Sequence, residues 1–309
     1  MRKAVFLGAL VLLLVAGCGN LSAPAEATDE EVVVADLALD EAILTDDTLG
    51  GAMVSTADVG PLSDWPGPAR RFVRRFFEEH HEELPADLPQ CVDVIEGVDN
   101  DGDGVVAGFE ASFHCLREIP SGNTFSFTGT LRFDDLNDQD AEERGYELTF
   151  EHFEARFEGA GRQGQNVELV RSFDGWVRVE PAFNEAGDPT SLTITKDLDF
   201  SFTRTVGDKS WTQSTHLQRT STYTPDDPAA PFAAGTLNVE GRLDHVGGRA
   251  ISVTVSTEVG LHFNRACEAS PRFDAGRLVI KRYVDGVLSL TRVLTFKDCG
   301  YYTVEVIKP

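Results

Sequence analysis

The chain has 309 residues with 51 acidic and 27 basic side chains, which gives a formal net charge of −24. Its apolar content of 41% is sufficient for a buried core, so a wholly disordered chain is excluded. Because an acidic chain is repelled by phosphate backbones, nucleic acid is not expected as a partner. The length suits one large domain or two small ones, with tails.

The N-terminus has the pattern of an export signal. Two basic residues precede an uncharged apolar run over residues 4–16, which is too short to span a bilayer comfortably. The run ends in the sequence Val-Ala-Gly-Cys at 15–18, which resembles the lipobox of bacterial lipoproteins.

This resemblance implies that residues 1–17 are a signal peptide that is removed, and that the thiol of Cys18 is acylated. Removal of Arg2 and Lys3 with the signal changes the formal charge of the mature chain to −26. The sorting habit of the family, applied to Gly19, implies the outer membrane of a bacterial envelope. The expected membrane contact is therefore a lipid anchor on Cys18.

Residues 18–64 are expected to be an acidic linker between the anchor and the folded domain at 65–309. No basic residue occurs between Lys3 and Arg70, so the linker repels itself and extends. Its one apolar part, residues 32–44, fits either a short helix or a strand.

One helix is predicted, over residues 68–84, because apolar side chains recur there at helical spacing. The apolar face consists of Phe72, Val73, Phe76, Phe77, His80 and Leu84. Four Arg residues precede four Glu residues along this segment, which is the order that the helix dipole disfavours. Two alternatives follow: a helix packed over a sheet with its Arg side chains paired to acids, or a basic contact for headgroups or an acidic partner.

The rest of the chain is predicted to be an antiparallel sheet, either a sandwich or a curved half-barrel. Apolar and polar residues alternate in several segments, for example at 125–133 and 146–150. The alternation slips by one residue before Phe153, which predicts a β-bulge. The pair Asp285-Gly286 predicts a two-residue hairpin turn.

Four cysteines are left once Cys18 is assigned to the lipid, and an oxidising envelope favours disulfides between them. Three pairings are possible. We predict Cys91–Cys115 and Cys267–Cys299, because each joins nearby strands of one local unit. A cysteine metal site is the alternative, but the chain has no Cys-x-x-Cys spacing.

Residues 99–110 match the calcium loop of EF-hand proteins, Asp-x-Asp-x-Asp-Gly followed by five residues and Glu. The ligands that this resemblance implies for Ca²⁺ are Asp99, Asp101, Asp103, the carbonyl of Val105, and Glu110. The flanks alternate as strands rather than helices, so a hairpin centred on Asp103 should place Cys91 opposite Cys115. Without the helix pair, a structural ion of weak affinity is expected rather than an opening switch.

The sequence evidence for other candidate sites is weaker. The acidic stretch 134–140 lacks the glycine and the register of the loop, so we interpret it as a solvated turn. His80 and His81 are adjacent and would point apart on a helix. No catalytic motif is present, which leaves no enzyme class to propose.

Two functions fit these features. The first is a lipid-anchored envelope module that holds a structural Ca²⁺ and binds a protein or polysaccharide partner. The second is a periplasmic carrier of lipids or lipoproteins, with an open apolar half-barrel lined by Phe side chains from several strands.

Overall fold

The computed structural model describes residues 91–309 except for gaps at 103–104, 120–121, 141–144, 161–164 and 269–271. The predicted signal peptide, the linker and the predicted helix at 68–84 lie outside these described residues. Every regular element in the described part of the chain is a β-strand, which confirms the all-β prediction. The same part contains no helix long and apolar enough to cross a membrane.

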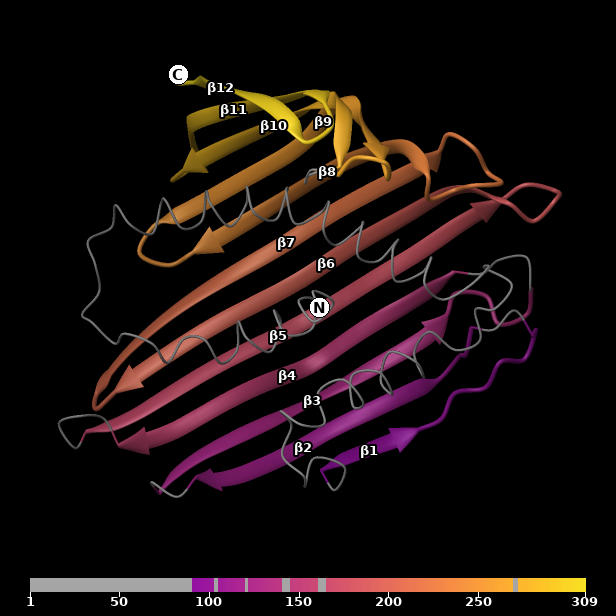
Figure 1. The fold of residues 1–309 in the computed structure, drawn as a ribbon. Coiled ribbons are helices and arrows are strands. Elements are labelled where there is room, and N and C mark those ends of the chain that lie inside the picture. The colour runs from indigo at the N-terminus through magenta and orange to yellow at the C-terminus, as the bar shows by residue number, and fades with distance from the viewer. Residues whose placement is uncertain (1–90, 103–104, 120–121, 141–144, 161–164, 269–271) are drawn as a thin grey trace. The chain divides into compact units, whose positions relative to one another are not determined.

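The strands form one open antiparallel sheet in which their order follows the chain (Figure 1). A sandwich needs two sheets, so that alternative does not hold for the described strands. The strands are β1 (Val92–Ile95), β2 (Phe109–Ile119), β3 (Asn123–Asp135), β4 (Tyr146–Ala160), β5 (Asn166–Phe183), β6 (Pro189–Val206), β7 (Lys209–Pro225), β8 (Ala234–Val246), β9 (Ala250–Asn264), β10 (Phe273–Val284), β11 (Val287–Asp298) and β12 (Tyr301–Ile307).

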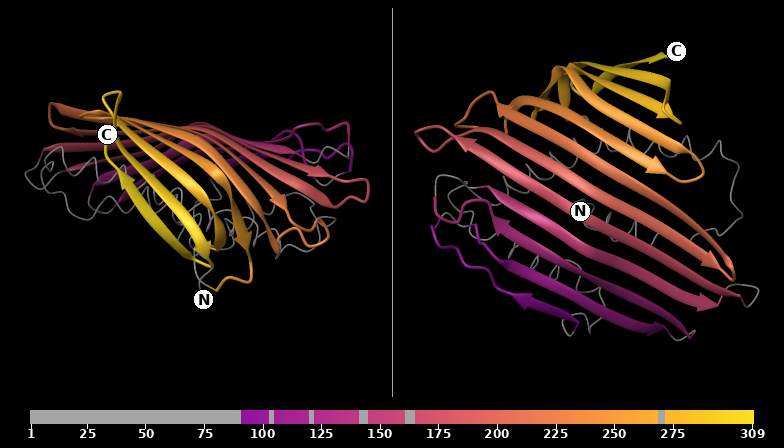
Figure 2. Two further views of the ribbon diagram at one scale, coloured as in Figure 1. Left: turned by 90° about the horizontal axis from the view of Figure 1, so that it is seen from above. Right: turned by 180° about the vertical axis from the view of Figure 1, so that it is seen from behind.

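The described residues divide into two compact units. Unit 1 contains residues 91–177 and 198–214, and therefore holds β1 to β4 with parts of β5, β6 and β7. Unit 2 contains residues 178–197 and 215–309, and therefore holds the remaining parts of those three strands with β8 to β12. Within each unit, consecutive strands lie side by side in two further views (Figure 2).

In unit 1, the alternation of the sequence separates a buried face from a charged one. Phe109 of β2 lies opposite Phe133 of β3, and these side chains are 5% and 1% exposed. The neighbouring pair, Glu110 and Arg132, belongs to the other face because successive strand residues point to opposite sides. The buried cluster of unit 1 is Val105, Phe109, Ala111, Leu131 and Phe133.

The predicted bulge is present in β4. The register with β3 shifts between Thr128 and Thr130, and His152 on the facing segment has a φ of 52°. Gly129 allows this close approach, because a Cβ placed there would lie 2.7 Å from the Cα of Phe153. The extra residue restores the alternation, so that apolar side chains on both sides of the bulge face the same way.

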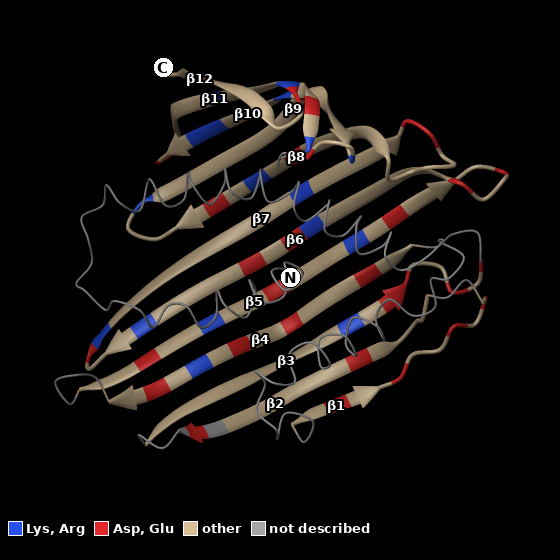
Figure 3. Ribbon diagram, viewed as in Figure 1, with Lys and Arg blue, Asp and Glu red and all other residues tan. Residues whose placement is uncertain are grey.

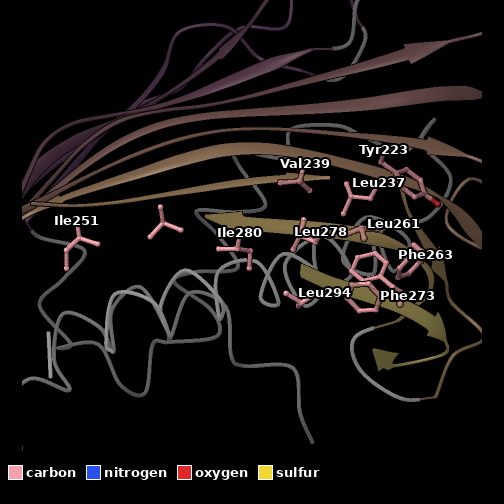
Figure 4. Close-up of a cluster of buried hydrophobic side chains, with 12 residues drawn as sticks. Tyr223, Leu237, Val239, Ile251, Leu261, Phe263, Phe273, Leu278, Ile280 and Leu294 are labelled. Carbon is pink, nitrogen blue, oxygen red and sulfur yellow. The ribbon is translucent and has the colours of Figure 1, made fainter. Parts of the chain in front are cut away.

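In unit 2, the core is larger and combines residues from β7 to β11 (Figure 4). Its most buried members include Val253, Leu261 and Leu294, each 1% exposed. The predicted hairpin joins β10 to β11 through Asp285 and Gly286, whose φ values of 50° and 80° suit a two-residue turn.

Candidate metal centre

The described residues of the predicted calcium loop lead from β1 into β2, and the last two residues of the loop, Phe109 and Glu110, already belong to β2. Val98 and Ala107 close its base with two backbone hydrogen bonds of 2.9 Å. Val105 is completely buried in the core of unit 1 and so holds the loop against the sheet. Asp103, one of the predicted ligands, lies outside the described residues.

The Cys91–Cys115 disulfide is present, in a register shifted by one residue from the expectation. The N–H of His114 donates to the carbonyl of Cys91 at 2.9 Å, so Cys91 lies opposite His114 rather than Cys115. The reason is the length of the turn. Because the bridge pair encloses residues 99–106, the hairpin has its centre between residues 102 and 103 instead of on Asp103.

The turn between β3 and β4 lies directly against this loop. The backbone N–H of Asn100 donates to Oδ1 of Asp138 at 2.9 Å, and its side-chain amide donates to the other oxygen of that carboxylate. The N–H of Gly108 donates to Oδ1 of Asp134 at 2.8 Å. Hydrogen bonds at both ends of the loop therefore hold the two turns together.

The contact between the turns brings three carboxylates together. Asp101 lies in the first turn, Asp135 is the last residue of β3, and Asp138 lies in the second turn. Each offers an oxygen, and these oxygens lie within 4.8 Å of one another. Figure 3 colours the acidic residues along these two turns red. Since Ca²⁺–oxygen distances are about 2.3–2.6 Å, oxygens with this spacing could share one ion.

Asp135 shows the electrostatic consequence of this crowding. Burial, together with the negative charges of Asp101, Asp138 and Asp99, raises the pKa of the Asp135 carboxyl, although the N–H of Asn137 opposes the shift. Its Oδ2 atom is buried without a hydrogen-bond partner among the described residues. A cation at this position would compensate both effects.

Two other predicted ligands make contacts of their own. Oδ1 of Asp99 accepts a hydrogen bond from the N–H of Gly102 at 2.7 Å, which folds the loop locally. Glu110 lies on the charged face, where its Oε2 forms an ion pair with Nε of Arg132 at 3.2 Å. Its Oε1 accepts from the hydroxyl of Ser112 at 3.2 Å. The carboxylates gathered at Asp101 thus come from the second turn and do not include that of Glu110.

The interpretation of residues 134–140 as a solvated turn did not foresee that Asp135 and Asp138 lie close to Asp101. A topological signal could have found them. In a sheet whose strands follow chain order, every second turn lies at the same end, so the β1–β2 and β3–β4 turns must be neighbours. Two acidic turns separated by two strands therefore form one candidate site.

A second polar cluster lies in unit 2 around His262 of β9. Its Nε2 contacts Asp226 at 2.8 Å and its Nδ1 contacts Asp274 at 2.5 Å. These hydrogen bonds, that to Asp226 first, raise the pKa of His262. Asp274 also lies near Cys267 and Cys299, but those two sulfurs form the second predicted disulfide and cannot act as thiolate ligands.

The His262 cluster makes stability depend on pH. A pKa that is raised on folding stabilises the protein below the unfolded value of about 6.5, and the gain is lost as pH rises through the folded pKa. We expect His262→Gln to lower the melting temperature by about 2–4 °C at pH 6 and by less at pH 9. The control variant is His114→Gln, which replaces a half-exposed histidine whose Nδ1 lies 3.7 Å from Oδ2 of Asp93. A difference between wild type and His262→Gln that is constant with pH would contradict this expectation.

Comparison with known protein families, curated proteins and solved structures gives no match to this chain. Fold and site therefore define only a coarse class, an all-β protein with an acidic site that could hold a metal ion.

Proposed function

We propose that this protein is a lipid-anchored module of the bacterial envelope that binds one Ca²⁺ between the β1–β2 and β3–β4 turns. The proposal rests chiefly on the convergence of Asp101, Asp135 and Asp138 from two turns. The match of residues 99–110 to a calcium loop supports it independently, because that match depends on sequence alone.

The proposed ligands are the three converging carboxylates, together with those of Asp99 and Asp103, which belong to the same loop as Asp101. All are hard oxygen donors, which suit Ca²⁺ and Mg²⁺. Ca²⁺ is the better candidate because it accepts irregular geometry from flexible turns, whereas Mg²⁺ demands a near-octahedral site and retains water. The ion would neutralise the mutual repulsion of the carboxylates from the two turns, and its role would be structural.

The decisive experiment is thermal melting and titration calorimetry of the purified protein in Ca²⁺, Mg²⁺ or chelator. With a Kd of about 10⁻⁴ M, about 1 mM Ca²⁺ should stabilise the fold by about 1.4 kcal/mol. The melting temperature should then rise by about 3–6 °C. Equal melting temperatures in the three conditions, with no heat of calcium binding, would mean that the loop is an acidic turn that binds no ion.

Two matched variants test which carboxylates bind the ion. Asp135→Asn should raise the melting temperature in chelator, because it removes a charge from a repulsive group, and should abolish the calcium-dependent increase. Glu110→Gln should leave the calcium-dependent increase intact if Glu110 stays paired with Arg132. If instead Glu110→Gln abolishes calcium binding and Asp135→Asn does not, the ligand set is that of the EF-hand loop.

The anchor is proposed from the lipobox resemblance at 15–18, with Cys18 as the acylated residue and the outer membrane as the location. Two further features of the sequence support this reading. An acidic linker of residues 18–64 would hold the folded part away from the membrane surface, and paired cysteines suit an oxidising compartment. The expected partner is a protein or a polysaccharide of the envelope.

A further inference from the structure

Six phenylalanine rings form a continuous row across β2 to β6 of unit 1, here called the aromatic row. Its members are Phe113, Phe127, Phe150, Phe153, Phe173 and Phe200. Along the row, ring centroids of neighbouring members lie 4.6–5.9 Å apart. Every ring is only partly buried.

The aromatic row lies on the same face as the core of unit 1. Phe113 of β2 packs against the core of unit 1. It lies opposite Gly129 of β3, and Phe127 is two residues away from that glycine, so Phe127 points to the same side of the sheet. The described strands of unit 1 provide no second layer over these rings. Because contiguous apolar side chains on a protein surface mark a site of packing or interaction, we expect an element that covers the aromatic row.

The sequence provides one segment with the matching pattern. Residues 68–84 place Phe72, Phe76 and Leu84 on one side of a predicted helix. A helix of that length is about 25 Å long. The aromatic row crosses five strands, or about 19 Å at the usual strand spacing, so one such helix could cover it.

Chain connectivity restricts this segment to the neighbourhood of unit 1. Only residues 85–91 separate it from β1, and they span at most about 25 Å when extended. β1 pairs with β2, which carries Phe113, the first ring of the aromatic row. A covering element supplied by the same chain is therefore present at high effective concentration.

The apolar pattern, the length and the connectivity of residues 68–84 thus point to one occupant for the aromatic row. We propose that residues 68–84 fold as an amphipathic helix across unit 1 and cover the aromatic row.

Photo-crosslinking in the full chain tests this proposal. Benzoylphenylalanine replaces Phe76, which should face the aromatic row, or Glu82, which should face away from it. The Phe76 position should crosslink within the same molecule to peptides from β3 to β5, at least five times more often than the Glu82 position. Equal yields at the two positions, or crosslinks mainly to unit 2, would overturn the proposal.

The same experiment separates the other possible occupants. Crosslinks from Phe76 to a second copy would assign the apolar side of residues 68–84 to a dimer. Crosslinks to added phospholipid vesicles would assign it to a membrane. Either result would contradict the proposal. The aromatic row would then be open to an acyl chain, as the alternative function of a lipid carrier requires.

A double-mutant cycle provides a second measurement. Phe76→Ala and Phe150→Ala should interact, so the shift in melting temperature of the double variant should be smaller than the two single shifts combined. Phe76→Ala and Leu294→Ala, the latter in the core of unit 2, should be additive. Additive behaviour in both cycles would contradict direct packing of residues 68–84 on the aromatic row.

Discussion

Replacing Cys18 with Ala is expected to move the protein from the membrane fraction to the soluble fraction. Each buried methylene of an acyl chain contributes roughly 0.8 kcal/mol to membrane binding, so removal of the residue proposed to be acylated would eliminate the proposed anchor. The acyl groups should be absent from the variant by mass spectrometry. The folded part should be unaffected, because Cys18 is not a residue of the described strands.

The control is a chain with Gly19→Asp, which keeps Cys18, the residue proposed to be acylated. It should stay in the membrane fraction and, by the sorting habit of lipoproteins, should favour the inner membrane. If Cys18→Ala were still recovered in the membrane fraction with its acyl mass, the lipoprotein proposal would fail.

Replacing both members of a disulfide with Ser is expected to destabilise the protein by about 3–4 kcal/mol. The bridges close chain segments with sequence separations of 24 and 32 residues, so the loss of constraint on the unfolded chain is similar for the two. For a chain of this size, the melting temperature should fall by on the order of 10 °C.

The two pairs should differ in calcium binding. Cys91–Cys115 closes the hairpin that carries Asp101, whereas Cys267–Cys299 lies in unit 2. Removal of the first pair should therefore weaken calcium binding, and removal of the second should not. Melting with and without Ca²⁺, combined with calorimetry, measures both effects. An equal loss of calcium affinity in both variants would contradict the assignment of the ion to the β1–β2 turn.

Local patterns were sufficient to predict several features of the fold. The alternation around Phe133, the slip before Phe153 and the Asp285-Gly286 turn are properties of adjacent residues, so each could be read without knowledge of distant contacts. Both disulfide pairings follow for the same reason, because each joins cysteines within one local group of strands.

The composition of the candidate metal centre required the tertiary structure. A match to residues 99–110 assigns every ligand to one segment, but Asp135 and Asp138 are brought to Asp101 by strand order and by the meeting of two turns. Glu110 was assigned to the ion by spacing alone, whereas cross-strand register places it beside Arg132. Spacing along the chain determines which groups can be close, and the pairing of strands decides which of them share a face.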